Sequence, residues 1–262
     1  MAVQRQVYLR PALHLLLGVW TELRAPQEWL RLRKSAVFKG IRLPKGDGSP
    51  VILIPGFLGD DSYLNDLYGW LLRIGYRPYF AGIGRNSECP EILVERLLFT
   101  INRVHVETFQ KVVLLGHSLG GTIAISAAIR DSGKISKIIT LGSPIHSAGV
   151  NPLVFVTASV LGSFIRTRGN RLENCYTDSC QCRFVKTLRY RLPKDVTAAA
   201  IYTREDKVVR WQCTVWPYGE GINFRVSGTH LGLAFNPQAY LQIAQFLGKT
   251  VVKERASLRV VA

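Results

Sequence analysis

One serine of this chain stands between glycines at the end of an apolar run. Residues 112–115 are all Val or Leu, and the motif Gly-His-Ser-Leu-Gly-Gly follows them, with Ser118 as its serine. A glycine on each side lets the backbone turn sharply from a strand into a helix, which exposes the hydroxyl at the apex. The small-residue helical pattern over 119–130 completes that context. We therefore predict that Ser118 is a nucleophile; the alternative is an idle serine in a glycine-rich connection.

A nucleophilic serine needs a base, and the base needs an orienting carboxylate. In a strand–turn–helix architecture these partners follow the serine in the order acid, then histidine. Of the five histidines, only His230 follows a late predicted strand in a glycine-bearing loop, Ser-Gly-Thr-His-Leu-Gly. We predict that His230 is the base, with a structural histidine as the alternative. His117 adjoins Ser118, so we expect it to point elsewhere and to pack beneath the turn.

The acid is expected after the strand that precedes the histidine strand. The stretch 202–209, Tyr-Thr-Arg-Glu-Asp-Lys-Val-Val, places two carboxylates there. Asp206 lies just before the two valines and can turn inward, while Glu205 faces solvent. We predict Asp206 as the acid and keep Glu205 as the alternative.

Attack on a carbonyl also requires N–H donors for the developing oxyanion. The residue after the nucleophile supplies one, which is Leu119 here. The second comes from the loop after an early strand, where the sequence reads Pro-Gly-Phe. Pro55 has no N–H, and Gly56 lets the backbone approach closely, so the predicted donor is Phe57.

Strands and helices alternate around these motifs. Predicted strands cover 51–54, 78–81, 111–115, 137–141, 197–202 and 222–226, and predicted helices cover 62–74, 90–108, 119–130 and 237–247. Continuous apolar strands that alternate with helices predict an α/β fold with a doubly wound, mostly parallel sheet. The core is expected to comprise 47–144 and 195–250. Residues 1–46 form an N-terminal amphipathic helical segment in this scheme, 145–194 an insertion, and 251–262 a basic C-terminal tail.

Taken together, the motifs resemble the α/β-hydrolase superfamily, and within it the lipase/esterase branch. The resemblance rests on Pro-Gly-Phe, Gly-His-Ser-Leu-Gly-Gly, Gly-Ser-Pro, Tyr-x-x-x-Asp-x-Val-Val and Gly-Thr-His-Leu-Gly-Leu, and it covers about residues 50–248. It implies that Ser118, Asp206 and His230 form a catalytic triad, with Phe57 and Leu119 as oxyanion donors. It also implies that the insertion is a cap or lid. Many lipases have histidine where this chain has Pro55. This difference leaves open whether the chain belongs with the true lipases or with a less studied group of esterases.

The first part of the insertion, 152–165, is apolar and rich in small residues. Such a cap builds an apolar acyl pocket, with ordinary core packing as the alternative. We expect four residues to line the pocket: Leu58, Phe155, Leu161 and Leu231.

These features predict a serine hydrolase that cleaves carboxylic esters with apolar acyl chains, so that a lipid or another apolar ester is the substrate. No metal or organic cofactor is required. One alternative is an acyltransferase that uses the same acyl-enzyme. A second alternative is a non-catalytic membrane- or nucleic-acid-binding protein on a hydrolase scaffold, which the complete set of motifs disfavours.

The formal net charge of +16 lies outside the motif-bearing segments. Residues 1–45 carry nine Lys/Arg against two acidic residues, and residues 166–194 carry eight against two. This excess suits an anionic membrane surface, with an ordinary solvated surface as the alternative; we expect no nucleic-acid partner. No apolar run is long enough to cross a bilayer, and the basic-then-apolar start lacks a clean signal cleavage site. We expect a cytoplasmic protein at the membrane face, with secretion as the minority alternative.

Five cysteines occur, three of them within eight residues of one another. Their spacing is not a zinc pattern. A disulfide between this cluster and Cys213 is one interpretation, and buried free thiols are the other.

Overall fold

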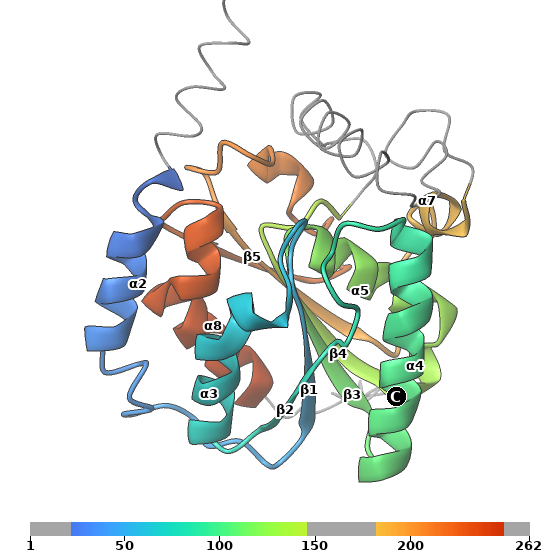
Figure 1. Cartoon of the computed structure of the whole chain (residues 1–262), viewed down its shortest axis with the longest axis horizontal. Coiled ribbons are helices and arrows are strands. Elements are labelled where there is room, and N and C mark those ends of the chain that lie inside the picture. Colours follow the sequence, from blue (N-terminus) through green and yellow to red (C-terminus); the bar gives the residue numbers. More distant parts are fainter. Residues whose placement is uncertain (1–21, 146–181, 249–262) are drawn as a thin grey trace, which may run out of the picture.

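A six-stranded parallel sheet forms the centre of the molecule. The computed structural model describes residues 22–145 and 182–248 (Figure 1). The strand order is β2-β1-β3-β4-β5-β6, and every neighbouring pair is parallel. The strands are β1 (Pro50–Ile54), β2 (Arg77–Phe80), β3 (Val112–His117), β4 (Ile135–Leu141), β5 (Thr197–Thr203) and β6 (Ile222–Val226). The predicted doubly wound α/β architecture is therefore confirmed.

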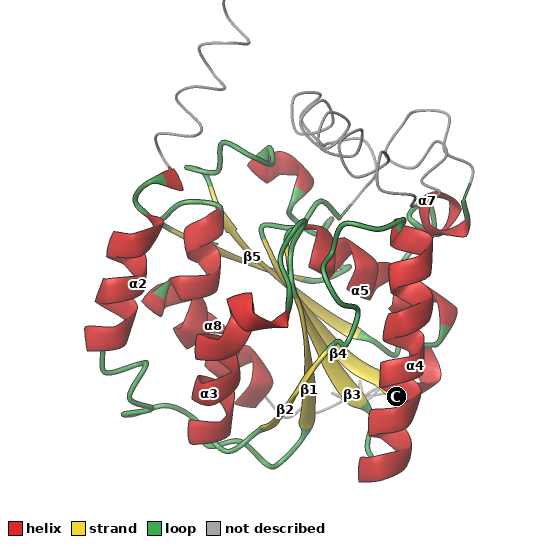
Figure 2. Ribbon diagram, in the orientation of Figure 1, coloured by secondary structure: helices red, strands yellow, loops and turns green. Residues whose placement is uncertain are grey.

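Helices cover both faces of this sheet (Figure 2). One face carries α2 (Ala25–Lys34), α3 (Asn65–Arg73) and α8 (Pro237–Gly248), and the other carries α4 (Pro90–Thr108), α5 (Leu119–Arg130) and α7 (Arg183–Thr187). Along β1, Ile52 and Ile54 enter the core beneath α4 and α5, whereas Val51 and Leu53 enter the core beneath α3 and α8. A strand buried on both faces must be apolar at every position, which explains its uninterrupted run.

The order of the strands creates a topological switch point at which a site can form. Strand β1 pairs with β2 on one side and with β3 on the other. The connections that leave β1 and β3 therefore diverge to opposite faces of the sheet, through α3 and α5. Ligands of open α/β sheets bind outside the carboxyl ends of the strands at such a switch point. The loop after Ile54 and the turn at Ser118 both lie there.

Several element boundaries differ from the sequence prediction by a few residues, and two of these differences have a clear physical cause. The helix expected over 62–74 begins as a 3-10 turn, η1 (Asp61–Leu64), before α3 starts at Asn65. The Asp60 carboxylate accepts the Ser62 N–H at 3.0 Å, which favours this tight start. Strand β3 continues to His117, because its pairing with β4 runs as far as Leu141.

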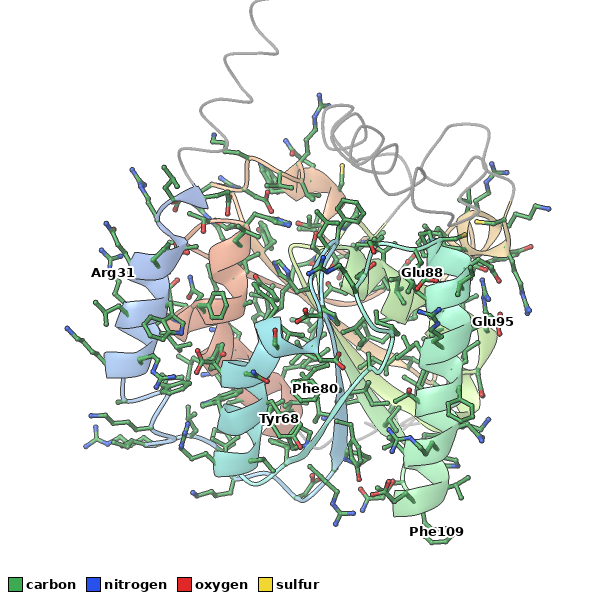
Figure 3. All side chains as sticks on the ribbon, viewed as in Figure 1. Arg31, Tyr68, Phe80, Glu88, Glu95 and Phe109 are labelled. Atoms are coloured by element: carbon green, nitrogen blue, oxygen red, sulfur yellow. The ribbon has the colours of Figure 1, made fainter. Side chains whose placement is uncertain are left out.

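Aromatic packing ties the outer helices to the sheet. Tyr68 of α3 stacks on Phe80 of β2 with 4.5 Å between ring centroids (Figure 3).

Three further short 3-10 turns complete the described chain: η2 (Ser132–Lys134), η3 (Trp211–Cys213) and η4 (Leu231–Phe235). None of the described helices combines the length and the apolarity that a membrane crossing requires.

Candidate active site

Ser118 stands on a strained turn between β3 and α5. Its backbone has φ 52° and ψ −125°, a conformation that L-residues rarely adopt. The flanking glycines make this turn possible by their lack of a side chain. A Cβ at Gly116 would overlap the backbone of Gly120, and a Cβ at Gly120 would overlap the carbonyl oxygens of Ile54 and Pro55. The turn therefore presses directly against the end of β1.

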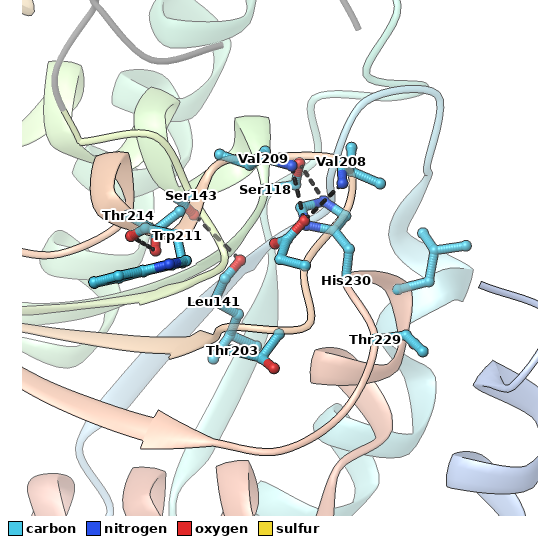
Figure 4. Close-up of polar contacts among 12 residues, drawn as sticks. Ser118, Leu141, Ser143, Thr203, Val208, Val209, Trp211, Thr214, Thr229 and His230 are labelled. Atoms are coloured by element: carbon cyan, nitrogen blue, oxygen red, sulfur yellow. Dashed lines mark hydrogen bonds and ion pairs between the residues drawn. The ribbon is translucent and has the colours of Figure 1, made fainter. Parts of the chain in front are cut away.

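The three residues predicted to act together converge on one hydrogen-bonded chain. The Ser118 Oγ lies 3.0 Å from His230 Nε2, and His230 Nδ1 lies 2.6 Å from Asp206 Oδ2. The residues come from the ends of β3, β5 and β6, and Figure 4 shows Ser118 and His230 facing each other. Both His230 and Asp206 are buried. These are the contacts that a nucleophile, a base and an orienting acid require.

The Asp206 carboxylate is fixed from its other side. Its Oδ1 accepts the N–H groups of Val208 at 2.8 Å and Val209 at 2.7 Å (Figure 4), which directs Oδ2 at the imidazole. Because a carboxylate accepts at Nδ1, the proton of His230 lies on that nitrogen and the Nε2 lone pair faces Ser118. Glu205, the alternative acid, is exposed and lies outside this chain of contacts.

Charges around His230 favour its protonated form. Burial alone would lower the pKa of His230, but the charge and the hydrogen bond of Asp206, together with the charge of Glu22, raise that pKa above its usual value. Glu22 belongs to the segment before α2. A raised pKa suits the predicted role of His230 as the base that accepts a proton from the serine.

His117 lies beneath the turn, as its position in the motif suggests. Its Nε2 donates to the backbone carbonyl of His230 at 3.0 Å, while its Nδ1 is buried and has no hydrogen-bond partner among the described residues. Burial, and then the charge of His230, lower the pKa of His117 to about 3. His117 is thus a neutral support for the loop that carries the base.

The loop after β1, which is the predicted oxyanion loop, approaches Ser118 through Gly56. A Cβ on Gly56 would lie 2.9 Å from His117 Nδ1 and 3.2 Å from Ser118 Cβ, so only glycine allows this approach without displacement. The predicted donors, Phe57 and Leu119, each follow one of the two residues in contact. Leu119 is also the first residue of α5, where backbone N–H groups have no partner within the helix.

A buried asparagine that the sequence analysis missed holds this loop. The side chain of Asn86 donates from Nδ2 to the Pro55 carbonyl at 2.8 Å. The backbone of Asn86 accepts the Leu58 N–H at its carbonyl at 2.7 Å and donates its N–H to the Gly59 carbonyl at 2.8 Å. Leu58 adopts φ 63° between these bonds. The Gly-Arg-Asn-Ser stretch has turn-forming residues, but nothing in it signals a contact across 31 residues.

Gly142 is a second residue of the site that the sequence analysis did not identify. It has φ 57°, and a Cβ there would lie 3.2 Å from His230 Nδ1 and 3.3 Å from Asp206 Oδ2. The Gly-Ser-Pro motif contains this glycine, and that motif was its only signal. Gly142 leaves the room in which the acid and the base meet.

The predicted acyl pocket is described only in part. Leu58 is half-buried beside Phe57, and Leu231 is 42% exposed beside His230. Phe155 and Leu161 lie outside the described residues, as does most of the predicted cap. A cleft of about 610 Å³ lies elsewhere, between α2 and the loop that follows β6, and Ser118 does not line it. The composition of the pocket therefore stays a prediction.

The structure describes only some of the cysteines in the predicted disulfide. Cys213 carries no disulfide in the structure, and Cys175 and Cys180 fall outside the described part of the chain.

Comparisons with known proteins agree with this architecture. A model of the PGAP1-like alpha/beta domain family matches residues 92–168. Among solved structures, Aspergillus fumigatus lipase B is similar with a TM-score of 0.56 and 16% identity, over 78% of this chain and 53% of that chain. The chain thus spans about half the length of that lipase. A search of curated proteins finds no match.

Two shorter enzymes match over nearly their full length. Bacillus licheniformis lipase BlEst2 has a TM-score of 0.55 and 17% identity, over 79% of this chain and 93% of that chain. Paleococcus ferrophilus monoacylglycerol lipase has a TM-score of 0.52 and 15% identity, over 79% and 96%. At such identities the likeness shows the fold alone, and that fold is the α/β-hydrolase fold.

Proposed function

We propose that the protein is a serine hydrolase that cleaves carboxylic esters with apolar acyl chains through an acyl-enzyme on Ser118. The observation that carries this proposal is the unbroken chain of contacts from Asp206 through His230 to the Ser118 Oγ, at 2.6 and 3.0 Å. The named lipases that share the fold support the same class of reaction. The apolar stretch 152–165 supports an apolar acyl group.

The geometry supports a two-step reaction. The Ser118 Oγ attacks the ester carbonyl while His230 Nε2 takes its proton, and the same nitrogen then gives that proton to the leaving alcohol. Water, deprotonated by His230, next attacks the acyl-enzyme and releases the acid and the free serine. Asp206 holds the imidazole in its tautomer and stabilises the imidazolium. The N–H groups of Phe57 and Leu119 bind the oxyanion in both steps.

Hydrolysis of a series of p-nitrophenyl esters with increasing acyl length, with and without a lipid–water interface, tests the proposal. We expect turnover that rises with acyl length and that falls by about 10⁴-fold or more in Ser118→Ala, since loss of the nucleophile leaves only oxyanion binding and positioning. Ser126→Ala is the matched control, because Ser126 is buried in α5 and its Oγ has no hydrogen-bond partner among the described residues.

Two results would count against this assignment. Turnover that survives in Ser118→Ala removes Ser118 as the nucleophile. Transfer of the acyl group to an added alcohol in preference to water makes the protein an acyltransferase that uses the same acyl-enzyme.

A further inference from the structure

Two glutamates near the start of the described chain bind the loop that carries His230. Glu28 of α2 accepts the Thr229 N–H at 2.9 Å with one carboxylate oxygen and the Thr229 hydroxyl at 2.8 Å with the other. Glu22 accepts the N–H of His230 at 3.1 Å and that of Leu231 at 2.8 Å. Three consecutive backbone N–H groups, centred on the base, therefore end on carboxylates from about 200 residues earlier in the chain.

The loop is shaped around Glu28. A Cβ on Gly232 would overlap the Glu28 carboxylate, and a Cβ on Gly228 would lie 2.8 Å from Glu28 Oε1. The Thr229 hydroxyl that donates to Glu28 also accepts the Gly232 N–H at 3.0 Å. Glu28 is 9% exposed, and burial of a carboxylate is costly unless it accepts strong hydrogen bonds. The loop supplies those bonds and leaves the space for them.

Helix α2 is anchored to the domain independently of this contact. Leu32 is fully buried in the core beneath α3 and α8. On the same helix, Trp29 Nε1 and Arg33 Nη1 donate to the two oxygens of Asp66 in α3, at 2.6 and 2.7 Å. Figure 1 shows α2 against the chain that leads into α8. The contacts of Glu28 and Glu22 with the loop are therefore additional to those that dock the helix.

From this geometry we infer that Glu28 and Glu22 are positioning residues for the catalytic histidine, and that the described chain from Glu22 through α2 is a working part of the active site. The inference rests on the proposed role of His230 as the base. The two carboxylates fix the backbone on both sides of the imidazole. Displacement by about 1 Å at a reacting group can reduce turnover by about 100-fold, so a small shift of this loop should act on kcat rather than on KM.

The two glutamates are expected to differ in their effect on pH dependence. The charged and titratable groups that face His230 are Asp206 after β5, His117 of β3, and Glu22; Ser118 lies at its Nε2. The Glu22 charge helps to raise the pKa of His230, whereas Glu28 makes no such contribution. Glu22→Gln should therefore move the acid limb of the kcat/KM profile to lower pH, and Glu28→Gln should leave that limb in place.

The experiment compares Glu28→Gln, Glu22→Gln and Gly232→Ala with Asp66→Asn in the full-length chain. Gly232→Ala displaces the Glu28 carboxylate without removing its charge. We expect kcat to fall by about 10- to 100-fold in the first three variants with KM nearly unchanged, and to stay within about twofold of the unaltered protein in Asp66→Asn, which loosens α2 from α3 only. Unfolding midpoints show that each variant is folded at the assay temperature.

A second readout separates this inference from the proposed function. A fluorophosphonate forms a bond from its phosphorus to the Ser118 Oγ and releases fluoride, so its rate measures the serine–histidine pair without any ester. Slower phosphonylation of Glu28→Gln and Glu22→Gln supports the inference even if the ester class is wrong. Equal rates and equal kcat in folded variants overturn it. A chain that is not phosphonylated at all overturns both proposals.

Discussion

Two histidine rings lie side by side in the site, with 5.1 Å between their centroids, yet their surroundings act on them in opposite directions. Both are buried. His230 faces the Asp206 carboxylate, which raises its pKa despite burial. His117 donates to a neutral carbonyl and faces His230, so burial and then that neighbour lower its pKa to about 3. Only one of the two rings can therefore carry the proton that the reaction moves.

His117 should make the fold sensitive to mild acid. Its pKa is near 6.5 in the unfolded chain and about 3 in the folded protein, so the unfolded state gains a proton first as the pH falls below 6.5. Between pH 7 and 5.5 this lowers the free energy of unfolding by about 1 kcal/mol. The raised pKa of His230 acts in the opposite sense within this window, because the stability it contributes is lost as the pH rises from 6.5 through that pKa. The difference between a His117 variant and the unaltered protein isolates the contribution of His117.

Urea unfolding of His117→Gln at pH 7 and 5.5 tests this expectation. Glutamine can donate to the same carbonyl but takes up no proton, so the variant should lose about 1 kcal/mol less than the unaltered protein over that interval. His105→Gln, on α4, controls for the removal of a histidine. An unchanged pH dependence in His117→Gln would show that this ring is not the group that titrates on unfolding.

At the scale of elements, Asn86 of the segment after β2 holds the predicted oxyanion loop with both its side chain and its backbone. Asn86 is fully buried and makes three hydrogen bonds to the loop over 55–59. Asn86→Ala leaves the Pro55 carbonyl without its donor, which should lower the free energy of unfolding by about 1–3 kcal/mol. Loss of the loop geometry should lower kcat by about 10- to 100-fold.

Steady-state kinetics and urea unfolding of Asn86→Ala measure both effects. Asn102→Ala is the matched control, because Asn102 is exposed on α4. If kcat stays at the level of the control while stability falls, the Asn86 side chain supports the fold and is not needed for the geometry of the predicted oxyanion loop.

Local patterns located the elements and the three converging residues for a physical reason. The strands of a doubly wound sheet are buried on both faces, so their apolar runs are visible in the sequence, and site residues follow the strand ends. The supports of the site follow no such pattern. Glu28 reaches Thr229 across 201 residues, and Asn86 reaches Pro55 across 31. A buried glutamate on an amphipathic helix looks like a surface residue until its partner is in place.

Across the whole molecule, one group of exposed basic residues stands on and after α7. Exposed basic residues in and after α7 include Arg183, Lys186 and Arg189; the charge of Arg183 also acts on Glu91 and helps to lower the pKa of that carboxyl. In Figure 1, α7 lies at the upper edge, where the strands end. A basic surface at this end of the sheet suits the proposed action on apolar esters, because it would hold the protein against an anionic membrane.

We therefore expect the protein to bind vesicles that contain anionic lipid, and to release them as salt rises, since screening shortens the reach of surface charges. Replacement of Arg183, Lys186 and Arg189 by Gln should weaken binding by about 1 kcal/mol for each residue. The control replaces Arg77, Arg103 and Lys111 by Gln. These residues lie toward the amino ends of the strands, away from α7, and their replacement should weaken vesicle binding less. Vesicle co-sedimentation over a series of salt concentrations measures both. Equal binding to neutral vesicles at high salt would show that this charge serves only the solvated surface.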